Sequence, residues 1–199
     1  VLTSFRPPGY PAFLTLIYGI SGVGTRRFLA ARLAQALLGA TLAPLSWILA
    51  RQSGYGQRTA RWAAIIVAVF PLLIIYPLAL ATENLFVPLL TLALILTLRA
   101  VEGERPHGYL AAGCVLGLAA LTRSIVAGFV PVASTWVWWT AREKRTGLRN
   151  AVLLGLAFMT ITAHWAVRNT LLHGQPTWIE ASLGYDLYVG YHPQATGTF

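Results

Sequence analysis

The fold is decided by residues 62–98, which read WAAIIVAVFPLLIIYPLALATENLFVPLLTLALILTL and contain one charged residue, Glu83. As a single helix this stretch would be about 55 Å long, at about 1.5 Å per residue, whereas the hydrocarbon core of a bilayer is about 30 Å thick. We therefore expect two membrane spans that fold back on each other, with Glu83 at the turn. A charge near mid-membrane would cost at least about 2.5–3.5 kcal/mol, whereas a charge at a hairpin tip costs little.

The composition of the whole chain indicates an integral membrane protein. Of its 199 residues, 56% are hydrophobic and only 11% are charged. This is too few charged residues to cover the surface of an ordinary soluble domain. The net charge of +9 comes almost entirely from arginines that lie between apolar runs, so it indicates membrane orientation rather than nucleic-acid binding. The chain starts at Val1 without a signal-peptide pattern, and we expect it to be an internal fragment of a longer protein.

The predicted fold is all-α, a polytopic helical membrane protein that forms a single transmembrane domain. Residues 1–27 are expected to hold the end of an outer loop and, over residues 10–20, a helix that lies in the outer membrane interface. Residues 168–199 are expected to begin a further outer loop, and Arg123 is expected at the tip of a second hairpin. Over residues 28–167, six spans are predicted at about 28–50, 62–81, 84–98, 109–122, 125–140 and 150–167.

The orientation of these spans follows from the basic residues in the short loops, which are more frequent on the cytoplasmic side. One set of alternate loops carries most of them, namely Arg51, Arg58, Arg61, Arg99, Arg105, Arg142, Lys144, Arg145 and Arg149. The opposite set carries Glu83, Arg123 and Arg168. Three further arginines flank the first span on this second side, but the bias over the whole chain still predicts that Glu83 and Arg123 face the outside.

Four charged residues are predicted at the outer face although they lie far apart in the sequence: Arg6, Glu83, Arg123 and Arg168. Charges cost least at the tips and flanks of spans, which is a sufficient explanation for any one of them. Four on one face, with aromatic residues nearby, favour an anionic ligand at the level of the outer headgroups. Arginine side chains suit such a ligand because they make charge-assisted hydrogen bonds to phosphate.

No other motif defines a site by itself. Residues 19–24 (GISGVG) lack both the Gly-Lys-Ser/Thr ending of a phosphate loop and a preceding strand, so a flexible link is the simpler explanation. The histidines His164, His173 and His192 have no metal-ligand spacing, and a single cysteine, Cys114, excludes a disulfide framework.

Several short segments resemble a known family, the membrane glycosyltransferases of the GT-C class. Within that class they are most similar to the dolichyl-phosphate-mannose–protein mannosyltransferases and the bacterial aminoarabinose transferases. The similar segments are residues 6–14 (RPPGYPAFL), 82–86 (TENLF), 118–123 (LAALTR), 168–169 (RN), 184–188 (GYDLY) and 190–197 (GYHPQATG). The resemblance implies transfer of a sugar from a polyprenyl-phosphate carrier to a lipid, glycan or protein hydroxyl on the outer face, by a single displacement that inverts the anomeric carbon.

The resemblance also implies roles for individual residues. Arg6 and Arg123, together with Tyr10 and Arg168, are expected to bind the carrier phosphate. Glu83 is expected to position substrate or a metal, or to assist the catalytic base, while the main base is expected upstream of this chain.

The segment after the last span is expected to contact the sugar or the acceptor through Tyr185, Asp186, Tyr188 and His192. No cofactor is predicted, and a divalent metal is left open. The expected partners are the lipid-linked sugar donor, the acceptor and membrane lipids, with no nucleic acid. The expected location is the bacterial inner membrane, with the site facing outside.

Two alternatives belong to other classes, a transporter or flippase and a non-catalytic membrane subunit. A transporter site would lie near mid-membrane, at broken helices with buried polar groups. The predicted spans are almost free of mid-span charge, and the charges gather at one face. This distribution favours chemistry at the membrane surface.

Overall fold

The computed structural model describes residues 4–192, and its secondary structure there is entirely helical. This confirms the predicted all-α fold class. In chain order the elements are α1 (Gly9–Ser21), α2 (Arg26–Ala40), α3 (Leu42–Gln52), α4 (Gln57–Val69), α5 (Pro71–Ile75), the 3₁₀ helix η1 (Tyr76–Leu78), α6 (Glu83–Gly103), α7 (Pro106–Thr122), α8 (Val126–Thr140), α9 (Lys144–His173) and α10 (Leu183–Tyr191).

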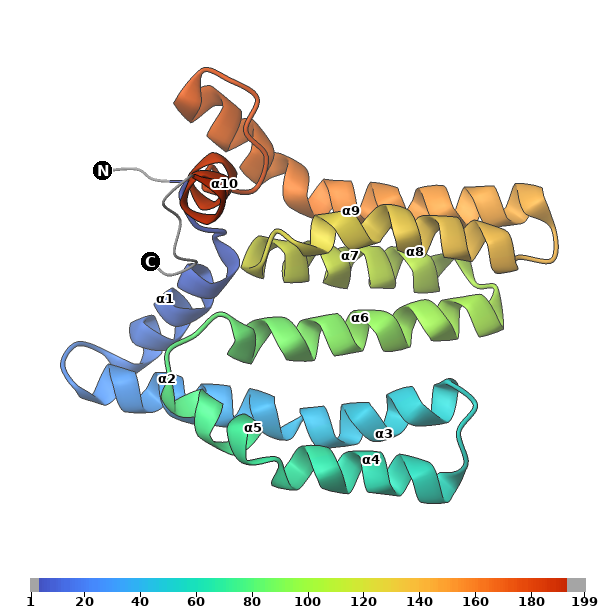
Figure 1. Ribbon diagram of the computed structural model, residues 1–199, viewed down its shortest axis with the longest axis horizontal. Helices are drawn as coiled ribbons and strands as arrows, with labels where there is room; N and C mark the ends of the chain where they lie inside the picture. Colours follow the sequence, from blue (N-terminus) through green and yellow to red (C-terminus); the bar gives the residue numbers. More distant parts are fainter. Residues whose placement is uncertain (1–3, 193–199) are drawn as a thin grey trace.

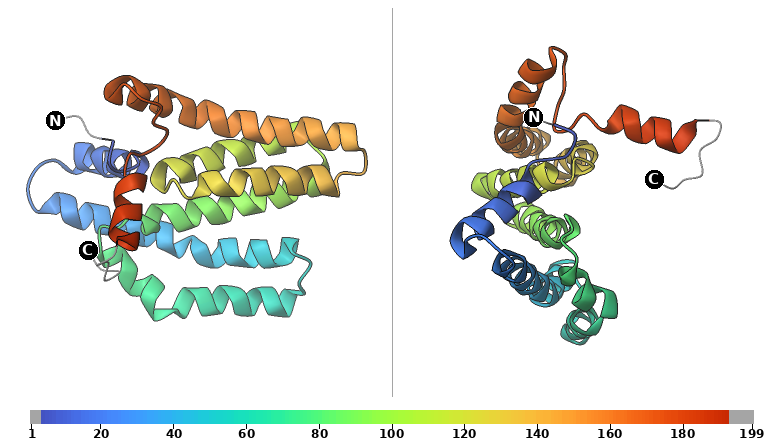
Figure 2. Two further views of the ribbon diagram at one scale, coloured as in Figure 1. Left: turned by 45° about the horizontal axis from the view of Figure 1, so that its top comes forward. Right: turned by 90° about the vertical axis from the view of Figure 1, so that its left-hand side faces the viewer.

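The long helices run side by side in one bundle, with α3 between α4 and α6, and with α7 packed on both α6 and α9 (Figure 1). The α3–α4, α6–α7 and α8–α9 connections lie at one end of the bundle, whereas α1, the α7–α8 turn and α10 lie at the other. The left view of Figure 2 shows the same division, and its right view looks along the bundle from the end that carries α1 and α10. The two hairpin tips that the sequence predicted, at Glu83 and Arg123, therefore lie at the same end.

The number of spans differs from the expected six. Within residues 4–192, three helical segments are long and apolar enough to cross a membrane: Arg26–Gln52, Glu83–Gly103 and Lys144–His173. A fourth is obtained if α4 and the segment Pro71–Leu78, bent by 51° against each other, count as one span. The remaining two predicted spans, α7 and α8, are helices of 17 and 15 residues. At about 1.5 Å per residue they are about 25 and 22 Å long, shorter than the hydrocarbon core of about 30 Å.

Prolines explain the bend in the fourth segment. Pro71 and Pro77 have no backbone N–H to donate, so carbonyls near them lose their helical partners. Where η1 ends, side chains of α2 supply partners for two further carbonyls: Gln35 Nε2 donates to the Pro77 carbonyl at 3.1 Å, and Arg32 Nε donates to the Leu78 carbonyl at 3.0 Å. Two carbonyls of this non-helical stretch are thus bonded to side chains of α2.

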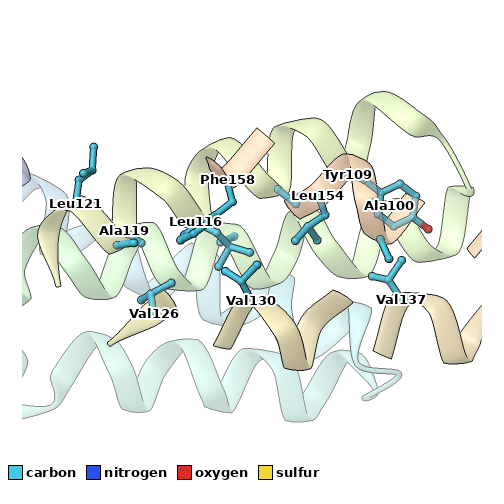
Figure 3. Close-up of a cluster of buried hydrophobic side chains, with 14 of the residues drawn as sticks. Ala100, Tyr109, Leu116, Ala119, Leu121, Val126, Val130, Val137, Leu154 and Phe158 are labelled. Atoms are coloured by element: carbon cyan, nitrogen blue, oxygen red, sulfur yellow. The ribbon is translucent and has the colours of Figure 1, made fainter. Parts of the chain in front are cut away.

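Small residues let α7 and α9 approach closely. A Cβ built on Gly117 would lie 2.7 Å from Ile161 Cβ, and one built on Gly113 would collide with the Leu154 carbonyl. Glycines four residues apart on one helix face are a common device for close helix packing in membranes. Around this contact the buried core gathers side chains of α7, α8 and α9, including Leu116, Val130 and Phe158 (Figure 3).

The helix predicted over residues 10–20 is present as α1, which lies obliquely across one end of the bundle (Figure 1). Its first residue, Gly9, touches the end of α7, since a Cβ there would lie 2.7 Å from the Leu121 carbonyl oxygen. Leu16 and Ile20 are exposed apolar residues on the same helix. They suit a helix in the membrane interface, a placement that stays a prediction.

The last predicted span ends later than expected. We placed its end at residue 167, but α9 continues to His173, so Arg168 and Asn169 are helical rather than part of a loop. The residues that follow turn back onto α9 before α10 begins. The helix continues because residues 168–173 contain neither Pro nor Gly, and it ends at Gly174, whose φ of 65° is left-handed.

Candidate functional site

A polar cavity of about 260 Å³ lies at the end of the bundle where the two hairpin tips meet. Four segments far apart in the sequence form its walls: the residues before α1, the start of α6, the α7–α8 turn and the α9–α10 connection. The lining residues are Arg6, Pro7, Thr82, Glu83, Thr122, Arg123, Ser124, Ile125, Glu180 and Ser182. Three of the four charged residues that the sequence grouped together, Arg6, Glu83 and Arg123, are therefore brought to one place.

Glu83 and Arg123 form an ion pair in this cavity. Arg123 Nη1 donates to Glu83 Oε1, and Thr82 Oγ1 donates to the other carboxylate oxygen at 3.1 Å. Glu83 is the first residue of α6, where the helix dipole favours a negative charge. The side chains are 33% and 43% exposed, so solvent can reach the pair, and the guanidinium keeps further N–H donors that can bind a ligand.

Arg6 is positioned at the cavity by the residues that follow it in the chain. Two prolines restrict the backbone of the segment, and Gly9 then allows α1 to start against the end of α7. The guanidinium of Arg6 lies 5.5 Å from the ring centre of Phe5, which is a cation–π distance. The N-terminal segment is also tied to the α9–α10 connection, since the Ala181 N–H donates to the Ser4 carbonyl at 2.9 Å.

Glu180 lines the cavity, although the sequence analysis gave it no role. Its carboxylate accepts a hydrogen bond from Ser124 Oγ, next to Arg123 in the chain. One sequence signal could have singled it out, because Glu180 is the only charged residue between positions 174 and 185. Its approach to residue 124 depends on a tertiary contact that no local pattern predicts.

The α9–α10 connection is fixed to α9 by side chains of that helix. The buried Asn169 donates from Nδ2 to the carbonyls of Trp178 and Ile179, at 2.9 and 3.2 Å. Trp165 Nε1 also donates to the Ile179 carbonyl, at 3.1 Å. Asn169, which belongs to the Arg168-Asn169 segment of the family resemblance, therefore holds the α9–α10 connection against α9.

Arg168 does not line the cavity, although it was expected to bind the carrier phosphate. Its guanidinium lies 4.4 Å from the ring centre of Trp165, and Nη1 donates to Asn169 Oδ1 at 2.8 Å. These contacts place Arg168 beside the residues that anchor the α9–α10 connection. A phosphate contact from Arg168 stays a prediction.

Tyr10, the other expected phosphate ligand, is buried beside the cavity and does not line it. Its hydroxyl donates to Gln35 Oε1 at 2.6 Å, and Asn84 Nδ2 donates to the same oxygen at 3.2 Å. Burial, helped by the charge of Glu83, raises the pKa of Tyr10 to about 12, so the hydroxyl remains a neutral donor at physiological pH. Gln35, which the sequence analysis did not single out, thereby links α1, α2 and α6 next to Glu83.

Of the residues expected to contact sugar or acceptor, Tyr185, Asp186 and Tyr188 belong to α10 and His192 follows it directly. Tyr185, Tyr188 and His192 do not line the cavity. Tyr185 packs edge-on against Phe5 with ring centres 5.6 Å apart, and Tyr188 stacks on His192 at 5.0 Å. The backbone of Asp186 belongs to α10, but its side chain is not among those that the structure describes. The rest of the similar segment, residues 193–197, lies outside the described residues.

The metal that the sequence left open has no ready site in the described part of the chain. Among the side chains that the structure describes, no group of three or more His, Cys, Asp and Glu comes together. Two carboxylates line the cavity, and Glu83 is already paired with Arg123. This donor set does not fit a resident divalent cation, which needs several oxygen or nitrogen ligands.

A second, apolar groove of about 280 Å³ adjoins the polar cavity, and Glu83 lines both. The groove lies between the end of α2 and start of α3, the broken segment α5–η1, and the first turns of α6. Its lining residues are Gly39, Leu42, Phe70, Leu72, Leu73, Tyr76, Pro77, Glu83, Asn84, Val87 and Pro88. A charged cavity and an apolar groove therefore share one wall.

Taken together, these features define a helical membrane protein with a charged site at one end of its bundle. A family model described as dolichyl-phosphate-mannose-protein mannosyltransferase matches residues 5–167. The chain belongs to this family, of the GT-C class, and is a membrane glycosyltransferase. The match includes Arg6, Glu83 and Arg123 and ends before Glu180. No curated protein and no solved structure matches the chain.

Proposed function

We propose that this chain transfers a sugar from a polyprenyl-phosphate carrier to a hydroxyl of a lipid, glycan or protein at the outer membrane face. The observation that carries the proposal is the meeting of Arg6, Glu83 and Arg123 in one cavity, which adjoins an apolar groove. A lipid-linked sugar phosphate has the same two parts, an anionic head and a long apolar chain. The family assignment favours this reaction over the transporter alternative.

The two arginines suit the phosphate of the donor. In a single displacement, the acceptor oxygen attacks the anomeric carbon, the bond from that carbon to the phosphate oxygen breaks, and its electron pair leaves with the carrier phosphate. The leaving phosphate gains negative charge in the transition state, and guanidinium groups stabilise such charge by charge-assisted hydrogen bonds. Arg123 and Arg6 are the cations that line the cavity within the described residues.

Glu83 supports this step by positioning Arg123. Its carboxylate holds one guanidinium nitrogen, so the remaining donors of Arg123 point in a fixed direction rather than sampling many rotamers. The proton released by the acceptor passes to a carboxylate, a role in which Glu83 assists. Because the ion pair stabilises the charged form of Glu83, its positioning role is the stronger part of the proposal.

The apolar groove suits the first isoprene units of the carrier. It begins at Glu83, where the phosphate site ends, and its other lining residues are almost all hydrophobic. It runs beside the break between α5 and α6, where helices of the bundle leave room that lipid chains can enter from the membrane. An isoprenoid chain in this groove would place its phosphate between Glu83 and the arginines.

The outward orientation of the site rests on the distribution of basic residues. The end of the bundle opposite the cavity carries the α6–α7 and α8–α9 connections, which include Arg105 and Arg142. Basic residues in short loops are more frequent on the cytoplasmic side. The cavity end is therefore proposed to face outward.

Binding of sugar-free undecaprenyl phosphate to the full-length protein in nanodiscs tests the phosphate site. Arg123→Gln should weaken binding about 10- to 150-fold, because a hydrogen bond between charged groups is worth about 1.5–3 kcal/mol. Arg58→Gln, at the start of α4 on the opposite end, is the matched control and should leave binding unchanged. Equal affinities for the wild type and Arg123→Gln would contradict the proposal.

A further inference from the structure

Two carboxylates line the cavity, and they differ in what neutralises them. Glu83 is paired with Arg123, whereas Glu180 accepts a hydrogen bond from the uncharged hydroxyl of Ser124. Among the side chains that the structure describes, no Lys, Arg or His forms an ion pair with Glu180. Glu180 therefore brings a negative charge to the cavity that no cation of the described chain neutralises by direct contact.

Glu180 is held in this position from both sides. The preceding residue, Ile179, is buried, and its carbonyl accepts hydrogen bonds from Trp165 and Asn169 on α9. The following residue, Ala181, donates its N–H to the Ser4 carbonyl at 2.9 Å. Backbone anchored on either side leaves the carboxylate little freedom beyond its own rotamers, which is the condition for a preorganised binding group.

The negative charge of Glu180 determines which part of the donor, phosphate or sugar, can lie beside it. A phosphate is repelled by Glu180 and attracted by the arginines, so the charged head of a donor lies toward Arg6 and Arg123. The sugar is bonded directly to that phosphate and must occupy the rest of the same cavity of about 260 Å³. Carboxylate oxygens accept hydrogen bonds only, and sugar hydroxyls are the donors that such a ligand offers.

We propose that Glu180 binds hydroxyl groups of the donor sugar and is a specificity-determining residue of this enzyme. The inference rests on the proposed function and names the part of the donor that meets this wall of the cavity. Ser124 holds one carboxylate oxygen, which leaves the other to accept from the sugar. Glu180 also lies beyond the residues that match the family model, where a contact specific to this chain's own sugar is expected.

The test compares two kinds of probe on the full-length protein in nanodiscs. One probe is sugar-free undecaprenyl phosphate, and the others are undecaprenyl phosphates linked to mannose, glucose, galactose or arabinose. Glu180→Gln keeps the shape of the side chain and a carbonyl for Ser124 but removes the charge. Its affinity for the sugar-free carrier should not fall, because the substitution removes a charge that repels phosphate. Its affinity for the tightest-binding sugar-linked carrier should fall about 10- to 150-fold.

Two further variants make the outcome decisive. Glu102→Gln, an exposed carboxylate near the other end of α6, is the matched control and should change neither affinity. Arg123→Gln tests the phosphate site in the same assay. If Arg123→Gln does not weaken binding of the sugar-free carrier, the proposed function itself fails, whatever the result for Glu180→Gln.

Two results would overturn the proposal for Glu180. The first is an equal loss of affinity for sugar-free and sugar-linked carriers, which would assign the residue to the phosphate or to folding. The second is unchanged affinity for every sugar-linked probe. If turnover then falls about 10²- to 10⁴-fold, Glu180 would be a proton acceptor instead.

Discussion

At the scale of single residues, we expect the ion pair between Glu83 and Arg123 to contribute little to stability, and its proposed role is in the chemistry of the cavity. About a third of the Glu83 side chain and more than a third of the Arg123 side chain are exposed to solvent. Exposed ion pairs contribute about 0–1 kcal/mol to stability. The same pair fixes the direction of a guanidinium in the cavity. A substitution there is therefore expected to separate activity from folding.

We predict that Glu83→Gln lowers sugar transfer at least about tenfold and shifts thermal unfolding little, because it frees Arg123 without opening the core. The measurements are initial transfer rates of the full-length protein in proteoliposomes and unfolding followed by circular dichroism. Glu102→Gln is the control at the far end of the same helix. Normal transfer by well-expressed Glu83→Gln would show that the role assigned to Glu83 is wrong.

Gln35 has the opposite character, because it is fully buried and its amide is fully bonded. The oxygen accepts from Tyr10 and Asn84, and the nitrogen donates to the carbonyls of Pro77 and Ala79. Gln35→Leu leaves these partners unsatisfied in a buried site, which costs about 1–3 kcal/mol for a group that loses its bond.

We predict a clear drop in unfolding temperature for Gln35→Leu, accompanied by loss of transfer because α1 and α6 both shift. Gln57→Leu, at an exposed position at the start of α4, should change neither property. An unfolding temperature for Gln35→Leu equal to that of the wild type would contradict the buried network.

At the scale of elements, close packing decides where α1 begins and hence where Arg6 lies. Gly9 has no room for a side chain, since a Cβ there would lie 2.7 Å from the Leu121 carbonyl oxygen and 2.8 Å from Thr122 Oγ1. A Cβ on Gly19 of the same helix would meet nothing within 4 Å. The two glycines thus form a matched pair for testing whether the start of α1 must touch the end of α7.

Gly9→Ala should push α1 off the α7–α8 turn, cost about 1–3 kcal/mol as overpacking does, and lower carrier binding by displacing Arg6. Gly19→Ala should be neutral or slightly stabilising, because alanine is the better helix former by about 1 kcal/mol. Unfolding and undecaprenyl phosphate binding of both variants check this. Identical behaviour of the two variants would argue against the contact.

At the scale of the whole molecule, the two ends of the bundle are expected in different compartments. Ile125 is an exposed residue of the α7–α8 turn beside the cavity, and Tyr55 is an exposed residue of the α3–α4 connection at the opposite end. The positive-inside rule assigns the Tyr55 end to the cytoplasm.

In a Cys114→Ala background, Ile125→Cys should react with a membrane-impermeant maleimide added to intact cells. Tyr55→Cys should react only after the cells are opened. Labelling of both positions from one side would disprove the proposed sidedness. Labelling of Tyr55→Cys alone in intact cells would reverse the orientation and place the cavity in the cytoplasm.

The sequence by itself determined the helical membrane class, the two hairpin tips and the grouping of Arg6, Glu83 and Arg123. These follow from local costs, because a charge is tolerated where an apolar run turns at the membrane surface and is expelled elsewhere. Hydrophobic length was a weaker guide, since α7 and α8 are apolar but shorter than a bilayer core.

Only the tertiary structure decided which polar residues share the cavity. Glu180 enters it because Asn169 and Trp165 bend the chain back onto α9, whereas Arg168 turns to Trp165 and Tyr10 turns to Gln35. Such choices depend on hydrogen bonds between residues that are distant in the chain. The free energies of these hydrogen bonds depend on the packed environment, and no periodic pattern in the sequence predicts them.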